Sequence, residues 1–307
     1  MHAWGSQDDG RIIIGGVEAG GTKFNCVLAE SPECILERAT FATTTPQQTL
    51  EAVIAFFRAG EQRHGRLQAL GIASFGPVEL DPATPAFGHI TQTPKPHWSH
   101  VPILPRLREA LAVPVAFETD VNGAALGEQL GGAAAGLTDF AYVTVGTGIG
   151  AGLVSAGRLV HGVSHPEIGH MLLPRHPEDT YSGYCGFHGH CLEGLASGPA
   201  LQERWDLNAH SLPEDHPAWR IQAYYLAAMC HNLTCLTAPQ RIILGGGVMQ
   251  RSHLYDLTRQ QFLQMAGGYF PWISHATVSR YIVAPGHGDR AGEIGALILA
   301  QRILNAG

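Results

Sequence analysis

The sequence predicts an α/β protein built from two lobes. Short apolar segments rich in β-branched residues alternate with longer segments whose apolar residues recur every three or four positions, which indicates strands alternating with helices. A strand, a glycine turn and a second strand occur together at residues 11–28 and again at 140–154, about half a chain later. The 307 residues, 45% of them hydrophobic, suffice for two modest domains with separate cores.

The first lobe is expected to span residues 1–130, and it begins with the first of these units. An apolar run reaches a turn that contains Gly20 and Gly21, after which the chain is again apolar. Glycine suits such a turn because it reaches positive φ without steric cost and lets a ligand approach the backbone. Periodicity and composition predict the elements that follow: a helix at 47–64, strands at 70–75 and 113–117, and a helix at 122–130.

The second lobe, residues 131–290, repeats this opening. A strand at 140–145 meets a turn of alternating glycines, and the next strand continues to a hairpin turn at 155–158. A third glycine turn follows a strand predicted at 241–244. A final amphipathic helix at 291–305 is expected to return to the first lobe.

Composition excludes several classes of function. The net charge of −7 comes with no cluster of Lys and Arg, so the chain lacks the electrostatic signature of a nucleic-acid-binding protein. No apolar run reaches membrane-spanning length and the start does not resemble a signal peptide, so we expect a cytoplasmic protein that binds no membrane. Six cysteines are too few for a disulfide scaffold. Four are expected to be reduced and mostly buried thiols: Cys26, Cys34, Cys230 and Cys235.

The three glycine turns favour a nucleotide-binding protein, because each can present backbone N–H groups to a phosphate. One such turn alone is more often a simple hairpin, but three after buried strands are harder to explain in that way. The P-loop pattern is absent, since Lys23 follows Thr22 instead of preceding it. Gly146, Gly148 and Ala151 match a relaxed dinucleotide-binding pattern, but a hairpin follows where that pattern needs a helix.

Four residues form a candidate metal site. Cys185, His188 and Cys191 make a compact run with two residues between successive members, and His170 precedes it. Two thiolates and two imidazoles are a ligand set typical of tetrahedral zinc, and four protein ligands indicate a structural ion. His190 adjoins the run, but a thiolate binds zinc more tightly, so Cys191 is the better ligand. Short Cys/His spacings also arise without metal, and a chain with 17 histidines could place them there by chance.

Asp120 is a candidate catalytic carboxylate. It follows a predicted strand and precedes a helix, where active-site side chains of open α/β sheets gather. It could be the base that orients an attacking hydroxyl in phosphoryl transfer. It could equally be the N-cap of the helix, since Asp is a preferred capping residue.

Extended strings of sequence resemble the ROK family of sugar kinases, within the larger actin-like ATPase superfamily. The resemblance covers residue 16 to about residue 295, with the family's two phosphate motifs and its adenosine motif in order at 18–23, 145–150 and 245–249. It is closest to the bacterial fructokinase branch. The strings that carry this finer resemblance are SFGP at 74–77, TQTPKP at 91–96, ETDVNGAA at 118–125 and HPEIGH at 165–170.

The resemblance implies a two-lobed actin-like (ribonuclease H-like) fold with a zinc-binding loop at 170–191, ATP with magnesium in the cleft between the lobes, and a hexose at its base. Asp120 aligns with the family's general base, whereas Thr119, Glu167 and Glu193 align with sugar contacts. The resemblance assigns the following residues to ATP binding: Gly20, Gly21, Thr22, Lys23, Gly146, Thr147, Gly148, Pro199, Gly245, Gly246, Gly247, Val248 and Met249.

Two residues depart from the family pattern. Most members have Asp where this chain has Glu18, which leaves open its role toward magnesium or phosphate. Glucokinase members have Asn where this chain has Thr119, so an amide that would contact a pyranose hydroxyl is missing here. The resemblance therefore implies ATP-dependent phosphorylation of D-fructose to D-fructose 6-phosphate.

Other functions stay open on the same resemblance. A mannokinase or a broad hexose kinase would use the same motifs. The family also contains sugar-responsive repressors, but those carry an N-terminal helix-turn-helix, and only about ten residues precede the first predicted strand here. A noncatalytic sugar sensor with bound zinc is disfavoured by Asp120 together with the three nucleotide motifs. The resemblance also implies a homodimer.

Overall fold

The computed structural model describes residues 11–306. The chain forms two compact units. Unit 1 comprises the chain up to Gly127 together with the segment from Gly292 onward, and unit 2 comprises Glu128–Ala291. Each unit contains one five-stranded sheet. No helix in the described part of the chain is long and apolar enough to span a membrane.

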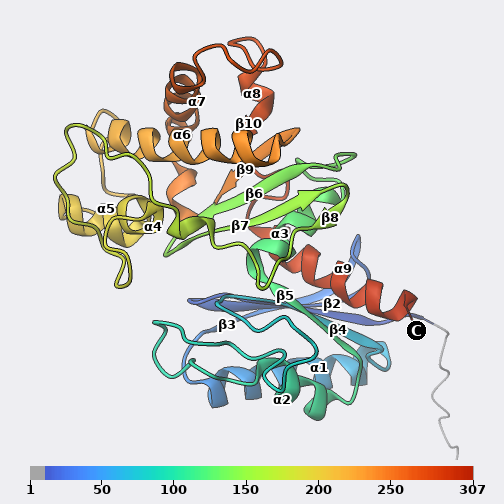
Figure 1. Ribbon diagram of the computed structural model, residues 1–307. Coiled ribbons are helices and arrows are strands. Elements are labelled where there is room, and N and C mark those ends of the chain that lie inside the picture. Colours follow the sequence, from blue (N-terminus) through green and yellow to red (C-terminus); the bar gives the residue numbers. More distant parts are fainter. Residues whose placement is uncertain (1–10, 307) are drawn as a thin grey trace, which may run out of the picture. The chain divides into compact units, whose positions relative to one another are not determined.

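The sheet of unit 1 has the strand order β3-β2-β1-β4-β5 (Figure 1). The first three strands form an antiparallel meander, whereas β1, β4 and β5 run parallel. Ala19 pairs with Ser74, and Ser74 pairs with Thr119, so the carboxyl ends of the parallel strands lie at one edge of the sheet. The strands are β1 (Ile14–Ala19), β2 (Lys23–Ser31), β3 (Cys34–Ala42), β4 (Ala69–Ser74) and β5 (Val115–Thr119).

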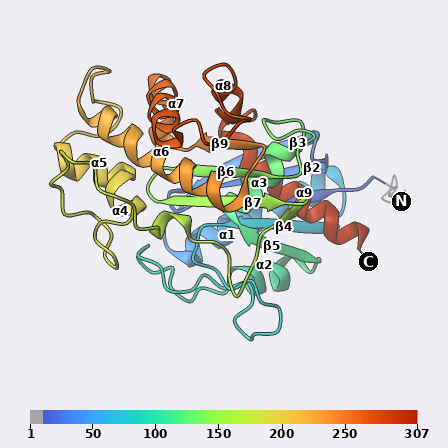
Figure 2. The same ribbon diagram turned by 45° about the horizontal axis from the view of Figure 1, so that its top comes forward.

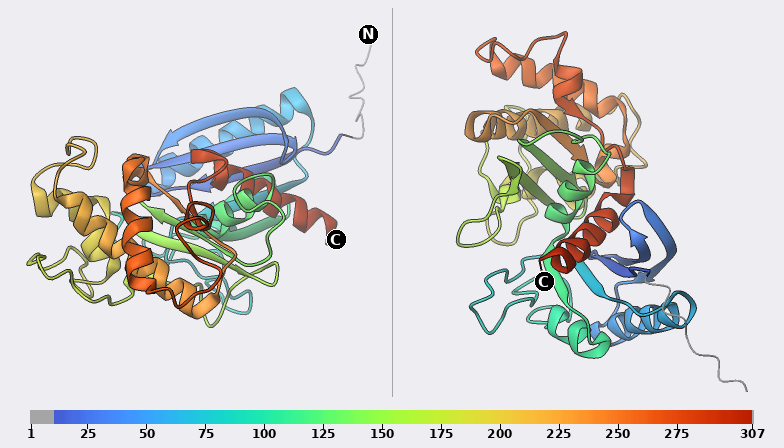
Figure 3. Two further views of the ribbon diagram at one scale, coloured as in Figure 1. Left: turned by 90° about the horizontal axis from the view of Figure 1, so that it is seen from above. Right: turned by 90° about the vertical axis from the view of Figure 1, so that its right-hand side faces the viewer.

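Helices cover both faces of this sheet (Figures 1 and 3). Phe57 of α1 and Leu104 of α2 are buried in the core on one face, and Leu297 of α9 is buried on the other. α9 lies so close to β4 that a Cβ atom at Gly71 would stand 1.9 Å from the carbonyl oxygen of Ala296. The helices are α1 (Pro46–His64), α2 (Ile103–Leu111), α3 (Asp120–Gln129), which runs into unit 2, and α9 (Ala291–Asn305).

The sequence specifies both ends of α1. The hydroxyl of Thr45 accepts the N–H of Gln48 and caps the helix, and Pro46 follows in the first turn, where no hydrogen-bond donor is needed. The helix ends at Gly65, whose φ of 106° is accessible to glycine and whose N–H donates to the carbonyl of Glu61.

The sheet of unit 2 has the order β10-β9-β6-β7-β8, which repeats the pattern of unit 1 with β6 in the place of β1. β6, β7 and β8 are antiparallel, and β6, β9 and β10 are parallel. The two glycine-turn units recognised in the sequence thus occupy equivalent places in two sheets of the same topology. The strands are β6 (Phe140–Val145), β7 (Ile149–Ser155), β8 (Arg158–Leu159), β9 (Arg241–Gly245) and β10 (Ile282–Val283).

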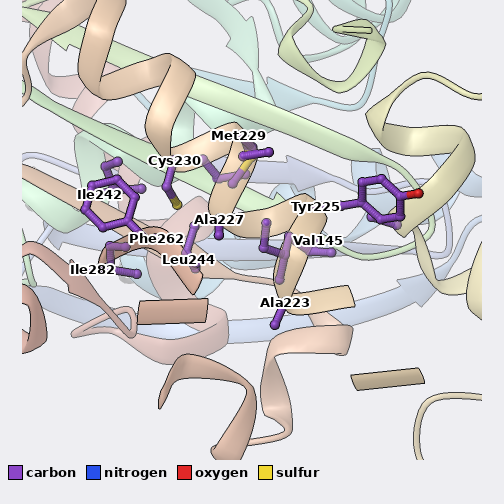
Figure 4. Close-up of a cluster of buried hydrophobic side chains, with 14 of the residues drawn as sticks. Val145, Ala223, Tyr225, Ala227, Met229, Cys230, Ile242, Leu244, Phe262 and Ile282 are labelled. Atoms are coloured by element: carbon purple, nitrogen blue, oxygen red, sulfur yellow. The ribbon is translucent and has the colours of Figure 1, made fainter. Parts of the chain in front are cut away.

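A long helix, α6, packs along this sheet, and α7 lies beside α6 (Figure 2). Figure 4 shows Ala223 and Ala227 of α6 in the same cluster as Leu244 of β9 and Phe262 of α7. The helices of unit 2 are α4 (Leu192–Ala196), α5 (Gly198–Trp205), α6 (Ala218–Thr237), α7 (His253–Ala266) and α8 (Val278–Tyr281), with short 3-10 turns η1 (Ile168–His170), η2 (Gly247–Gln250) and η3 (Gly288–Arg290).

The structure confirms the alternation of strands and helices and corrects some details. The strand predicted from residue 11 begins at Ile14. Cys26 and Cys230 are buried as expected, and burial raises the pKa of both thiols far above the usual value. Cys34 and Cys235 are exposed, so the expectation of burial was wrong for them, because they lie in an edge strand and on the outer side of α6.

Candidate functional site

The first glycine turn, residues 20–23, joins β1 to β2 at the edge where the parallel strands end. The N–H of Gly20 donates to the carbonyl of Lys23 at 3.0 Å and closes the turn. Thr43 donates its N–H to Thr22 O at 2.9 Å and its hydroxyl to Gly20 O at 2.7 Å. Because C=O and N–H point in opposite directions across a trans peptide, the N–H of Gly21 points away from Thr43. This orientation suits an N–H that binds a phosphate.

Asp120 lies at the same edge of the sheet of unit 1, two strands away from this turn. A strand spacing of about 4.8 Å puts the two roughly 10 Å apart. The cap of α3 is Thr119, whose hydroxyl accepts the N–H of Asn122 at 3.1 Å. Asp120 Oδ1 accepts the N–H of the next residue, Val121, at 2.9 Å. The capping role that the sequence left open for Asp120 is therefore filled by Thr119.

Glu118 and Asn122 support Thr119 by hydrogen bonds, and neither residue was predicted to have a role of its own. Glu118 Oε1 accepts the N–H of Thr119 at 2.9 Å and the side-chain amide of Asn122 at 2.8 Å. Thr119 is only 3% exposed. Its hydroxyl accepts the N–H of Asn122 through one lone pair, which leaves the other lone pair and the hydrogen for a ligand. In the sequence, a carboxylate and an amide stand four positions apart on the two sides of the strand end. This spacing could have indicated the pair.

Glu18, at the end of β1, is held by other side chains of unit 1. Its Oε2 accepts from Asn25 Nδ2 at 2.7 Å, and Asn25 Oδ1 accepts from Thr40 at 3.0 Å. The carboxylate also lies against the first turn of α9, where a Cβ atom at Gly292 would stand 2.3 Å from Glu18 Oε1. A helix N-terminus favours a negative charge. Glu18 therefore joins β1, β2 and α9 beside the first glycine turn.

The second glycine turn, residues 146–148, is held beside α4 and α5 by hydrogen bonds. Gly146 donates its N–H to Gly148 O at 2.9 Å, and Gly198 donates its N–H to Gly146 O at 2.8 Å. The carboxylate of Glu193 accepts the N–H of Ile149 at 2.9 Å. Pro199 follows Gly198 in the first turn of α5. Glu193 and Pro199, which the resemblance linked to sugar and to ATP, thus stand beside the same turn.

The third glycine turn meets the second at one edge of the sheet of unit 2, because β6 and β9 are parallel neighbours in which Thr144 pairs with Gly245. Gly246 has a φ of 91°, and a Cβ atom there would stand 2.5 Å from the carbonyl oxygen of Val145. The side chains of Val248 and Met249 are buried in the core, so these two residues can offer a nucleotide only their backbone.

The four predicted metal ligands come together in unit 2. His170, Cys185, His188 and Cys191 each bring one ligand atom into a group in which all atoms lie within 4.8 Å of one another. Three of the sulfur to Nδ1 distances are 3.8, 3.7 and 3.6 Å. Zn–S and Zn–N bonds of about 2.3 and 2.0 Å at tetrahedral angles require about 3.5 Å between sulfur and nitrogen. These three distances therefore fit a tetrahedral metal ion, although the 4.8 Å limit for the whole group leaves room for a small adjustment on binding.

The charge of the Cys191 thiol depends on whether a cation is bound at this group. Burial raises the pKa of the Cys191 thiol to about 11, although the N–H of Gly194 partly opposes that shift. Such a thiol stays protonated at neutral pH unless a cation stabilises the thiolate. Burial likewise raises the pKa of the Glu167 carboxyl. Nearby His170 lowers this pKa, and the charge of Glu193 raises it.

The metal ligands join the two segments that carry Glu167 and Glu193. His170 ends the η1 turn, and its N–H donates to Glu167 O at 3.0 Å. Cys191 directly precedes α4, which carries Glu193 in its first turn. An ion at this group would therefore fix the spacing between the η1 turn and α4.

A buried ion pair anchors the loop that contains the metal ligands. Asp179 lies 3.1 Å from the guanidinium of Arg204 on α5, and both side chains are more than nine-tenths buried. The hydroxyl of Tyr225 on α6 donates to Asp179 at 2.6 Å. Burial raises the pKa of Tyr225 to about 12, and its bond to Asp179 adds to the shift.

The predicted site residues thus gather in two groups. Unit 1 brings together the first glycine turn, Thr119 and Asp120, and unit 2 brings together the other two turns, Glu167, Glu193, Pro199 and the metal ligands. Two sheets of equivalent topology with glycine turns at the strand ends define the class: the fold is that of the sugar kinases of the actin-like ATPase type. The chain belongs to the ROK family, whose model matches residues 14–303.

Comparisons with individual proteins narrow the relationship. The chain is 44% identical to a putative fructokinase of Bacillus subtilis, over 96% of this chain and 97% of that protein. It is 43% identical to a fructokinase of Zymomonas mobilis, over 94% of this chain and 96% of that protein. Among solved structures, a ROK family glucokinase from Streptomyces griseus in complex with glucose and AMPPNP matches with a TM-score of 0.75 and 27% identity, over 94% of this chain and 99% of that one.

Proposed function

We propose that the protein phosphorylates D-fructose with ATP and produces D-fructose 6-phosphate and ADP. The observation that carries this proposal is the 44% and 43% identity to fructokinases over nearly the whole chain, against 27% to the glucokinase. Thr119 agrees with that choice, since the amide found in glucokinase members is missing here.

In this proposal backbone groups bind ATP and side chains act on the sugar. The glycine turns bind the phosphates of ATP through backbone N–H groups, and magnesium bound with ATP neutralises their charge. Asp120 accepts the proton of the sugar hydroxyl as that oxygen attacks the γ-phosphorus. Thr119, Glu167 and Glu193 orient the sugar by hydrogen bonds.

Zinc has a structural role in the proposal, held by His170, Cys185, His188 and Cys191. Four protein ligands leave no open position for chemistry at the ion. Its effect is to hold the η1 turn and α4 in place, together with the two glutamates that these elements carry. The cytoplasm as location and a homodimer as assembly are further parts of the proposal, and size-exclusion chromatography with light scattering tests the latter.

The experiment that tests the function measures ADP release in the presence of fructose, mannose, glucose or N-acetylmannosamine at equal concentrations. Fructose is expected to exceed glucose in kcat/KM by at least ~10-fold, the effect of one buried polar group left unpaired. Equal rates with mannose would indicate a broader hexose kinase, and ADP release that no sugar increases would contradict an enzyme of this class.

Thr119→Asn is the informative variant in this assay. Asn caps a helix as well as Thr does, so α3 should keep its start. The variant is expected to gain activity on glucose relative to fructose, whereas Thr119→Ser should leave the preference unchanged. If glucose is the best substrate of the unmodified enzyme, the argument from Thr119 is wrong.

A further inference from the structure

Trp98 connects a surface loop of unit 1 to the first glycine turn. Its indole is fully buried, and its Nε1–H donates to the carbonyl of Thr44 at 2.8 Å. Thr43, the residue before Thr44, holds the turn by two hydrogen bonds, from its N–H to Thr22 O and from its hydroxyl to Gly20 O. The indole N–H therefore binds the residue next to Thr43, and Thr43 in turn binds the carbonyls of the turn.

The ring of Trp98 also contacts β2 directly after the turn, and through Phe75 it is linked to the end of β1 before the turn. It lies 5.3 Å from the ring of Phe24, the first residue after the turn, and 5.6 Å from the ring of Phe75. Phe75 in turn donates its N–H to Ala19 O, just before the turn, at 2.7 Å. Trp98 therefore restrains the entry and the exit of the turn as well as its support.

The segment that carries Trp98, residues 91–100, is a compact loop closed by its own hydrogen bonds. His100 donates its N–H to Thr91 O at 3.0 Å, and the hydroxyl of Ser99 bonds both the N–H and the carbonyl of Thr93. Trp98 is the one buried residue of this segment. Trp98 is thus the buried anchor of the loop, which Thr91 also holds by donating its N–H and its hydroxyl to Pro77 O.

We propose that Trp98 is a positioning residue for the phosphates of ATP, and that loop 91–100 and the first glycine turn are coupled through Trp98, Thr44 and Thr43. The proposal rests on the proposed function, since the turn must bind a phosphate. Coupling of this kind is reciprocal: whatever orders the loop strengthens nucleotide binding, and nucleotide binding orders the loop. The indole N–H to Thr44 is the link that a substitution can remove.

Trp98→Phe removes this hydrogen bond and keeps an aromatic ring. Calorimetry with ADP is expected to show a Kd raised roughly 3- to 10-fold, the effect of one lost hydrogen bond. Hydrogen exchange should show that ADP protects residues 91–100 in the unmodified protein and protects them less in the variant. The matched control is Trp219→Phe, because Trp219 is equally buried and donates its indole N–H to Pro213 O at 2.7 Å in unit 2.

Thr43 supplies a second route in case Trp98→Phe folds poorly. Thr43→Val removes the hydroxyl bond to Gly20 O at nearly constant volume and should raise the Kd for ADP by a similar factor, whereas Thr43→Ser should restore it. In the double variant with Trp98→Phe, the Kd for ADP should rise by less than the product of the two single fold-changes. Both substitutions weaken the same chain of contacts to the turn.

An unchanged Kd for ADP in both Trp98→Phe and Thr43→Val would overturn the proposal, as would an equal loss of affinity in Trp219→Phe. These measurements use ADP without sugar. A protein that binds ADP but does not phosphorylate fructose would therefore contradict the proposed substrate, while the ADP affinities of the variants would still decide the role of Trp98.

Discussion

At the scale of single residues, two neighbours at the start of α3, Thr119 and Asp120, have different roles. Thr119 caps the helix and Asp120 does not, although both residue types are favoured at N-caps. The sequence could not make this distinction, because it depends on which residue holds the extended backbone at the end of β5. The strand end itself was predictable from the apolar run before it. The spacing of Glu118 and Asn122 along the chain could have indicated the pair that supports Thr119, but its hydrogen bonds need the fold.

Asp120→Asn tests the catalytic role at this position. Asn keeps the size of the side chain and its oxygen can still accept the N–H of Val121, so the fold and ADP binding should persist. Loss of the carboxylate is expected to lower kcat by roughly 10²-fold or more, the range for removal of a general base. A coupled ADP assay measures the change. A kcat within about twofold of the unmodified enzyme would rule out this role for Asp120.

Tyr225 allows a prediction about pH. Its pKa is raised from 10.0 to about 12 in the folded state, so the neutral phenol is favoured there and contributes stability below pH 10 that is lost as the pH rises toward 12. Tyr225→Phe also loses the bond to Asp179 and should lower the free energy of unfolding at pH 8 by about 1–3 kcal/mol. The difference in the free energy of unfolding between the variant and the unmodified protein should narrow between pH 10 and 12.

Urea unfolding at pH 8 and pH 11 measures this gap. Tyr224→Phe is the matched control, since Tyr224 is the preceding residue of the same helix and is partly exposed. A gap that stays constant or widens with pH would show that the phenol of Tyr225 is not the group responsible.

At the scale of elements, the metal ligands lie in a part of unit 2 with little regular structure. Between the η1 turn and α4 the chain has no helix and only isolated bridges, such as the one between Cys185 and Gly189. Cross-links must replace the missing hydrogen-bond ladders, and two of those present are the metal ligands and the bonds of Asp179 to α5 and α6. The first could be predicted from spacing, whereas the second needs the fold.

Removal of the metal should therefore unfold this loop. The purified protein is expected to contain one zinc per chain by elemental analysis, and a chelator should lower Tm because metal binding is coupled to folding of the site. Cys185→Ser and Cys191→Ser should lose both the metal and this response. The exposed Cys34 provides the control, since Cys34→Ser should keep the metal. Zinc-free protein from a preparation without chelator would contradict the metal assignment.

Several elements could not be predicted from the sequence, for physical reasons. β3 is an edge strand in which no residue is fully buried, so it lacks an apolar face. α2 begins between Pro102 and Pro105, which resemble helix breakers although proline is tolerated in a first turn. α6 is buried around most of its circumference, so no apolar stripe stands out. α1 and α9 were predictable because each has a distinct apolar side or a marked cap.

At the scale of the whole molecule, unit 1 is completed by the last helix of the chain. α9 packs on the sheet face that contains Ile14 and Ala69, and its backbone touches β4 at Gly71. Gly71→Ala would place a Cβ atom 1.9 Å from a backbone oxygen of α9, so helix and strand must separate. We expect a loss of about 3 kcal/mol or more in the free energy of unfolding, measured in urea.

The control for this variant is Gly162→Ala in unit 2, where the nearest atom to an added Cβ is 3.9 Å away. That substitution should change stability by less than about 0.5 kcal/mol. If Gly71→Ala were equally mild, the close contact of α9 with β4 would not hold in solution.

The distance in sequence between α9 and the rest of unit 1 has a consequence for synthesis on the ribosome. A further 180 residues follow Gly127 in the 307-residue chain, and they require roughly 9 to 36 s at ordinary rates of translation. During that time the strands of unit 1 exist without the helix that covers one of their faces, and Ile14, Val27 and Ala69 lie on the uncovered side. Unit 2 is contiguous in sequence and can fold first. The nascent chain therefore presents an apolar sheet to chaperones until α9 has been synthesised.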